Sequence, residues 1–317
     1  MRATTRPHPA LITTLAGPRA VADPWAGYGP GAVTAARFQN FLLGGRDNFP
    51  ADRAAARTVG RILGASAARI AAAQRAFTTA AVTSAAVAGI TQVLDLGSGL
   101  PVEDAEVHDA ARAVTPGSSV VYVDQNPEVA VHSRALRCCY PRTGFTLADL
   151  RDPAAVLRSR DVTSLLDFTR PVAVVMTGVL HWIPGDISKA VEAYKDVCAP
   201  GSWLVVTHAS LDAITPARLS KIAKVFAEGP DKASPRPAAE ICALFTGWRL
   251  LAGGLADVRD WPSAEAVPPD PPAPARRAGV LGGIAVKPWP AGPCAQPAAP
   301  APGTGRNRGA RVPRPVL

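Results

Sequence analysis

The stretch "VLDLGSGLP", Val93 to Pro101, decides the fold. It begins as a short apolar run, typical of a buried strand, and runs into two glycines separated by a serine. These glycines permit a tight turn and a close approach of the main chain to a ligand. Open α/β sheets bind their ligands at the carboxyl ends of their strands. We therefore expect either a simple turn or a ligand-binding turn here, made by Asp95, Gly97, Ser98 and Gly99.

Further apolar runs alternate with helical segments along the chain. The predicted strands are 91–97, 118–124, 145–150, 170–180, 202–210, 248–255 and 279–287, and the predicted helices between them are 103–114, 127–136, 153–157, 187–197 and 238–245. The runs are continuous, which indicates strands covered on both faces. The βα alternation predicts a mostly parallel sheet with right-handed crossovers. We expect an α/β, Rossmann-like sheet of seven strands with helices on both faces.

The regions outside this alternation predict the domain organisation. Residues 51–88 are Ala-rich and indicate two helices, broken near Gly64. We expect a flexible segment at 1–30, a helical N-terminal extension at 31–88, the sheet domain at 89–288 and a disordered Pro/Ala/Arg-rich tail at 289–317. The Pro-rich segment 263–275 is also predicted to be flexible.

The charge and cysteine content exclude several classes of protein. The net charge is +9, but the region after Trp261 holds seven Lys or Arg residues against only Glu265 and Asp270. A basic tail binds phosphates weakly and does not make a specific nucleic-acid reader. No stretch approaches the ~20 apolar residues of a membrane span. Five cysteines without a CxxC indicate a cytoplasmic protein, and no His/Cys spacing suggests a metal site.

Two more aspartates follow predicted strands. Asp124 lies about 25 residues beyond the glycine turn, near the ~20 expected for an acid that binds a ribose. Asp149 follows the third strand, where a carboxylate can accept from an adenine amino group. Each could instead be a helix cap or a turn former. Together with Asp95, they place three acids at the ends of three successive strands.

The residues after the turn decide between ligands. A dinucleotide-binding loop would have a third glycine at position 102, where this chain has Val102, followed by Glu103 and Asp104. Two acids disfavour a diphosphate and suit a cationic ligand without phosphate. A DxGxG loop after the first strand is typical of enzymes that use S-adenosylmethionine (SAM), so the sequence predicts a SAM site.

Linked motifs extend this interpretation to a family. The stretches "RFQNFLLGGRDNFPADR", "VLDLGSGLP", "VVYVDQNP", "ADLRDP", "DFTRPVAVVMTGVLHWIP" and "LVVTHAS" resemble the actinobacterial S-adenosyl methyltransferase family, formerly a domain of unknown function, over about residues 35–287. The resemblance implies a class-I methyltransferase fold with an antiparallel last strand, SAM as cofactor and an unidentified, small-molecule acceptor. We assign three more residues at the strand ends to the cofactor site: Gln125, Leu150 and Thr177.

Two departures from the family pattern concern this site. The stretch "LPVEDAEVHDA" carries acids where members have a sequence like "LPTAGNVHEVA". The stretch from Asp124 to Pro127 reads Asp-Gln-Asn-Pro, where Asp-Asn-Asp-Pro is usual. The ribose acid is kept and a second acid is lost.

The stretch "RFQNFLLGGRDNFPADR", residues 37–53, begins like a helix and then runs into two glycines. We interpret it as a lid over the cofactor, in which Gly44 and Gly45 allow close approach. Arg46, Asp47 or Asn48 would address the carboxylate or amine of SAM, or the acceptor. The alternative is that Asp47 or Asn48 caps a helix that starts near Pro50.

The motif "MTGVLHWIP", residues 176–184, spans the end of the fourth predicted strand and the residues after it. His181 is the candidate general base, because the ordinary histidine pKa lies near neutrality. A structural role for His181 is the alternative, and His208 is a second candidate base. Trp182 can stack on adenine, close the pocket or belong to the core.

The predicted function is transfer of the SAM methyl group to a small molecule by direct in-line displacement. A non-catalytic SAM-binding regulatory module is the alternative from another class. The sequence predicts no specific nucleic-acid partner and no membrane partner, and it leaves the oligomeric state open.

Overall fold

The structure is a computed structural model that describes residues 25–64, 67–103, 106–251, 253–261 and 279–290. The segments predicted to be flexible, 1–30, 263–275 and 289–317, lie wholly or largely outside these ranges. Within them, no helix combines the length and the apolar character needed to span a bilayer.

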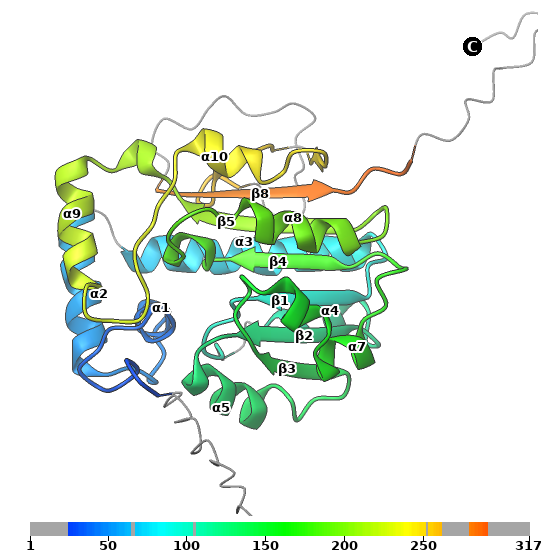
Figure 1. The fold of residues 1–317 in the computed structure, drawn as a ribbon, viewed down its shortest axis with the longest axis horizontal. Helices are drawn as coiled ribbons and strands as arrows, with labels where there is room; N and C mark the ends of the chain where they lie inside the picture. The colour runs from blue at the N-terminus through cyan, green and yellow to red at the C-terminus, as the bar shows by residue number, and fades with distance from the viewer. Residues whose placement is uncertain (1–24, 65–66, 104–105, 252, 262–278, 291–317) are drawn as a thin grey trace, which may run out of the picture.

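A single mixed sheet forms the centre of the molecule (Figure 1). Its order is β3-β2-β1-β4-β5-β8-β6, with a further short strand, β7, paired to β8. The first five strands are parallel and β8 runs antiparallel to β5. The strands are β1 (Gln92–Leu96), β2 (Ser119–Asp124), β3 (Thr143–Leu147), β4 (Ala173–Thr177), β5 (Trp203–Ala209), β6 (Arg249–Leu250), β7 (Ala256–Asp257) and β8 (Val280–Val286). The predicted α/β, mostly parallel sheet is confirmed.

One predicted strand differs in the structure. The run 248–255 forms only the two-residue strand β6, and β7 follows after a turn. Gly253 and Gly254 have φ values of +111° and +60°, which interrupt an extended chain. Both short strands pair with β8, so in the described residues the sheet has eight strands where the sequence predicted seven.

Ten α-helices and two short 3₁₀ turns surround the sheet in the described ranges. They are α1 (Ala35–Leu42), α2 (Pro50–Leu63), α3 (Ala67–Val87), α4 (Val107–Val114), α5 (Pro127–Leu136), α6 (Pro153–Leu157), α7 (Arg160–Leu165), η1 (Leu180–Trp182), α8 (Ser188–Val197), η2 (Leu211–Ala213), α9 (Pro216–Val225) and α10 (Ala238–Ala243). Gly64 ends α2 in the left-handed conformation, at the predicted break. Helices α7 and α9 were not predicted, and α4 begins four residues later than expected.

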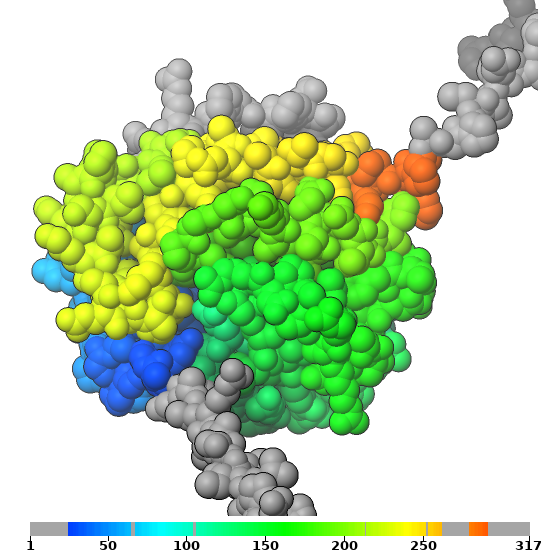
Figure 2. Space-filling view, viewed as in Figure 1, coloured from blue at the N-terminus to red at the C-terminus, as the bar shows by residue number. Residues whose placement is uncertain are grey.

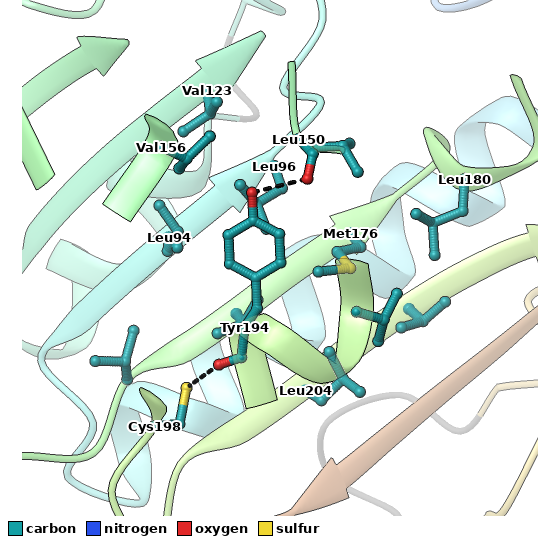
Figure 3. Packing of buried hydrophobic residues seen from close by; sticks show 14 of the residues in the cluster. Leu94, Leu96, Val123, Leu150, Val156, Met176, Leu180, Tyr194, Cys198 and Leu204 are labelled. Carbon is teal, nitrogen blue, oxygen red and sulfur yellow. Dashed lines mark hydrogen bonds between the residues drawn. The ribbon is translucent and has the colours of Figure 1, made fainter. Parts of the chain in front are cut away.

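Alternate strand residues face two separate cores, as the pleat of a strand requires. Val93 packs toward α3, α4 and α5, whereas Leu94 and Leu96 pack toward α6, α7 and α8. Figure 3 shows Tyr194 of α8 in the second core, where its hydroxyl donates to the carbonyl of Leu150 (2.9 Å). This bond fixes the loop that follows β3, which carries residues assigned to the cofactor site.

The N-terminal extension packs against α9 (Figure 2). Phe38 of α1, Val59 of α2 and Phe226, just after α9, are buried in one cluster. Arg37 of α1 is fully buried and joins the extension to the sheet domain: its Nε donates to Asp52 (2.9 Å) and its Nη1 to Glu128 of α5 (2.7 Å). Arg37 also donates to main-chain carbonyls before α1. The extension is therefore held to α5 by a partly buried ion pair whose arginine is fully buried.

Candidate functional site

A pocket opens at the carboxyl ends of β1, β2, β3 and β4, with α1 and α3 on its other side. The strand order reverses between β1 and β4, the place where open α/β sheets bind ligands. Nine of the predicted cofactor residues line it: Asp95, Gly97, Ser98, Gly99, Asp124, Gln125, Asp149, Leu150 and Thr177.

The glycine turn is clamped against the neighbouring strand. The N–H groups of Gly97 and Ser98 both donate to the carbonyl of Val123 in β2 (2.8 and 3.1 Å). Gly97 has a φ of +75°, and a Cβ there would lie 2.1 Å from the Val179 side chain. Gly99 has a φ of +63° and donates from its N–H to Asp124 Oδ2 (2.9 Å). Position 97 therefore requires glycine for both conformation and space.

Arg137 supports the same turn from behind. Its side chain is 1% exposed, and its Nη1 donates to Ser98 Oγ (3.1 Å) and to the Gly99 carbonyl (2.9 Å). Its Nε pairs with Glu106 (2.7 Å), and its guanidinium lies 4.2 Å from the Tyr122 ring centroid. One buried cation thus holds two acceptors of the turn, the Ser98 hydroxyl and the Gly99 carbonyl. The sequence analysis did not identify Arg137.

Two carboxyl groups, the buried one of Asp95 and the partly buried one of Asp124, face the pocket. Asp95 is 4% exposed, and burial raises its pKa to about 7. Burial also raises the pKa of Asp124 to about 6, although Asp124 Oδ1 accepts from the N–H of Asn126 (2.9 Å) and Oδ2 from that of Gly99. Each carboxylate oxygen can accept more than one hydrogen bond. A cationic ligand or hydroxyl donors would offset the cost of burying these charges.

Two further aspartates line the pocket. Asp149 pairs with Arg151 (2.6 Å); burial raises its pKa, but the hydrogen bonds from Arg151 outweigh this and the pKa is lowered overall. Asp231 Oδ2 accepts from the N–H of Ala35 at the start of α1 (2.7 Å), and burial raises the pKa of Asp231. Among the lining residues that the structure describes, Arg75 is the one Lys or Arg side chain. The pocket is therefore strongly acidic.

Helix α1 forms the wall opposite the sheet, one turn before the predicted lid residues. Gly45, Arg46 and Asn48 do not line the pocket, and Arg46 is exposed. Asn48 Nδ2 donates to Asn40 Oδ1 and to the Gly45 carbonyl (both 2.9 Å), and a Cβ at Gly45 would lie 2.3 Å from the Asn40 side chain. Asn40 does line the pocket, so Gly45 and Asn48 hold a lining residue in place.

The start of α2 differs from the predicted cap. Neither Asp47 nor Asn48 caps it: the N-cap residue is Phe49, whose N–H donates to Asp52 Oδ2 (2.9 Å). Asp52 also takes the hydrogen bond from Arg37, so it connects the start of α2 to α1.

His181 lies in a second cavity beside the first. This cavity has a volume of about 540 Å³ and shares Gln39, Gln74 and Trp182 with the cofactor pocket. Burial, and then the nearby His208 and Arg236, lower the pKa of His181 to about 3, so its ring is neutral. The N–H of Ala209 donates to His181 Nδ1 (3.4 Å), which leaves the ring proton on Nε2.

This tautomer can donate from Nε2, and its lone pair is already engaged, which favours a hydrogen-bond donor over the predicted general base. His208 is fully buried: its Nδ1 contacts the Ala209 carbonyl (2.8 Å) and its Nε2 contacts Arg236 Nη1 (2.9 Å).

One wall of the pocket that sequence reasoning missed comes from helices and from a distant loop. Its residues are Ala35, Ala36, Gln39, Asn40 and Leu43 of the α1 region, Gln74, Arg75 and Thr78 of α3, and Asp231. Gln74 and Thr78 are buried polar residues in an otherwise Ala-rich helix. Polar residues at positions that a helix buries were the available signal.

No group of three or more His, Cys, Asp or Glu side chains suited to a metal ion occurs in the part of the chain that the structure describes. A parallel sheet with an antiparallel strand beside β5, a glycine turn after β1 and acids at the carboxyl ends of β1, β2 and β3 define a class-I SAM-dependent methyltransferase.

The comparisons with known proteins agree with this class. A family model described as S-adenosyl methyltransferase matches residues 31–288. The chain is similar to a crystal structure of a candidate methyltransferase from Thermobifida fusca YX, with 36% identity, a TM-score of 0.72, and coverage of 82% of this chain and 96% of that one. It is also similar to a DUF574 family protein from Streptomyces avermitilis MA-4680, with 28% identity, a TM-score of 0.72, and coverage of 81% and 98%.

No curated protein matches the chain. The chain belongs to the S-adenosyl methyltransferase family, and SAM is its cofactor.

Proposed function

We propose that this methyltransferase transfers the SAM methyl group to a small molecule by direct in-line displacement. The observation that carries the proposal is the adjacency of two cavities: an acidic pocket at the strand ends and a larger cavity that shares Gln39, Gln74 and Trp182 with it. An acceptor in the larger cavity would meet the cofactor across these three residues.

The acidic pocket suits the cofactor in charge and in hydrogen bonding. In this proposal Asp124 accepts from the ribose hydroxyls, Asp149 from the adenine amino group and Asp95 from the ammonium group. Thr177 and the main chain of Gly97 lie beside the reacting end. Four aspartates around one pocket also favour the positive charge that distinguishes SAM from its product.

Bound SAM supplies a methyl group already activated by the positive sulfur. The chain therefore has to align the acceptor and exclude water. Alignment of this kind can lower the activation free energy by about 7–11 kcal/mol. Phe38 and Trp182 provide an apolar wall for the acceptor side. His181 Nε2 can donate to a polar atom of the acceptor and so orient it. A base is needed only for an acceptor that arrives protonated.

Radiolabel transfer tests the proposal. Purified protein is incubated with methyl-labelled SAM and the small-molecule fraction of an extract from the producing cells. We expect the label to enter an organic product together with an equal amount of S-adenosylhomocysteine. The variant Asp124→Ala should retain little SAM and transfer correspondingly less label.

SAM retention in equilibrium dialysis without any S-adenosylhomocysteine, in every fraction tried, would instead support the non-catalytic regulatory module.

A further inference from the structure

The second cavity carries information about the acceptor, and this inference rests on the proposed function. Its volume of about 540 Å³ falls in the range of about 300–1,000 Å³ that small-molecule sites occupy. The cavity lies between the N-terminal helices and α9, and it reaches the cofactor pocket at Gln39, Gln74 and Trp182.

Aromatic and aliphatic side chains form most of its wall. Phe38, Trp182 and Phe226 pack edge to face, with centroid distances of 5.9 Å for Phe38–Trp182, 5.2 Å for Phe38–Phe226 and 4.7 Å for Trp182–Phe226. The first comes from α1, the second from η1 and the third from the end of α9, so three separate segments build one aromatic wall. Aliphatic side chains complete it, among them Val59, Leu63 and Ile222.

The cavity offers no unpaired charge to an acceptor. Arg259 is the one ionised side chain among its described lining residues, and Asp257 neutralises it through two hydrogen bonds (2.8 and 2.7 Å). The remaining polar groups are the side chains of Gln39, Gln74 and His181 and the indole N–H of Trp182, which are neutral and lie at or near the junction with the cofactor pocket.

Charge selection follows from this lining. An anion would lose its hydration in an apolar cavity without gaining a free cation. A cation would lose its hydration in the same way, and with SAM bound it would also meet the positive sulfur across the junction, where like charges repel.

We propose that the acceptor is an uncharged, largely apolar small molecule with an aromatic or similarly flat body, and that its one polar group, the methylation site, lies at the junction beside Gln39, Gln74 and His181. The aromatic wall holds the body, and the neutral polar groups orient the nucleophile toward the cofactor.

Three naphthalene probes of matched size test the inference. The full-length protein, saturated with S-adenosylhomocysteine at pH 7.5, is dialysed against 2-naphthol, 2-naphthoate or 2-naphthylmethylammonium, and retention is followed by naphthalene fluorescence. We expect 2-naphthol to bind at least about 10-fold more tightly than either ion, because each ion has to be desolvated without a partner. Tighter or equal binding of an ion, or no retention of any probe, would overturn the inference.

A pair of variants locates the bound probe. Ala233 lines the cavity and Ala223 lies on the exposed face of α9. Ala233→Phe should abolish 2-naphthol retention and Ala223→Phe should not. Retention that survives Ala233→Phe would place the probe elsewhere and overturn the inference. S-adenosylhomocysteine binding reports whether each variant is folded. If Ala233→Phe does not fold, Ile214→Trp fills the same cavity and takes its place in the test.

The two proposals fail in distinguishable ways. Loss of labelled SAM binding by the unmodified protein would refute the proposed function. Normal SAM binding together with the wrong order of probe affinities would refute only the assignment of an uncharged acceptor.

Discussion

Replacement of Asp124 by alanine tests the assignment of the ribose site. The carboxylate lies at the end of β2 and accepts from the N–H groups of Gly99 and Asn126 (both 2.9 Å). In the proposed complex it also accepts from both ribose hydroxyls. A hydrogen bond to a charged group contributes about 1.5–3 kcal/mol.

Two such bonds at the lower end of that range give about 3 kcal/mol, which is about a 150-fold rise in Kd. SAM and S-adenosylhomocysteine have the same ribose, so the Kd of both should rise by the same factor. Isothermal titration calorimetry measures both values. Asp124→Asn, which keeps one carbonyl oxygen, should show an intermediate loss of about 10-fold.

The control variant separates the ribose contact from the local turn. Asp186 is exposed and accepts from the N–H of Ser188 two residues later (2.8 Å), as Asp124 does from Asn126. Asp186→Ala removes this type of turn far from the pocket lining and should leave both Kd values unchanged. A rise of less than about 3-fold in folded Asp124→Ala protein would refute the ribose assignment.

Two further predictions concern the buried ion pair and the buried acids. Arg37→Met leaves Asp52 and Glu128 without their buried partner and should lower the free energy of unfolding by about 3–5 kcal/mol, measured by urea denaturation. SAM affinity should fall as the pH is lowered from 8 to 5, because Asp95 and Asp124 have pKa values raised to about 7 and about 6 and become neutral in that window. Calorimetric titrations across the pH range measure this fall.

Each of these predictions has a control and a contradicting result. Arg61→Met, on the exposed face of α2, should change the unfolding free energy by no more than about 0.5 kcal/mol, and an equal effect of both variants would contradict the buried pair. Asp95→Asn should flatten the pH dependence of SAM affinity near pH 7. A SAM affinity that does not change with pH in the unmodified protein would contradict the role of the two acids.

The same acids set the sign of the pH effect on stability without ligand. A carboxyl group whose pKa is raised on folding binds more protons in the folded state, so its contribution to stability decreases as the pH rises from about 4 to 7. Bound SAM, which favours the ionised form, should oppose this decrease.

The sheet and its glycine turn were predictable because their signals are local. Val93, Leu94 and Leu96 form an apolar run interrupted only by Asp95, and two glycines with positive φ follow it. The strand, the turn and the ligand-binding end of the strand can therefore be identified within nine residues. Asp124 and Asp149 were predictable for the same reason: Asp124 is the last residue of β2 and Asp149 lies two residues after β3.

The other half of the pocket depends on contacts between distant segments. Asp231 accepts a hydrogen bond from the N–H of Ala35, which lies 196 residues away in the chain. Nothing near Arg137 in the sequence indicates that it will hold Ser98 and the Gly99 carbonyl. Sequence patterns report the environment of a residue along the chain, whereas these contacts are fixed only when the helices pack.

Two errors in the element assignment have local causes. The run 248–255 is apolar enough for a strand, but its glycine pair turns the chain. Helix α9 was overlooked although Thr215 caps it and Pro216 occupies its first position, which are standard start signals. The strand was predicted because its apolar pattern was given more weight than its glycine pair. The helix was missed because its start signal was not used.

The place of β8 in the sheet has a consequence for biosynthesis. This strand lies between β5 and the short strands, although it follows all of them in the chain. Ribosomes add about 5–20 residues per second, so roughly 4–15 s separate the emergence of Ala209 from that of Val286. During this interval the outer edge of β5, whose inner residues are almost completely shielded in the finished protein, has no hydrogen-bonding neighbour. Such an edge invites pairing with other nascent chains, so newly made protein is most prone to aggregation just before its last strand arrives.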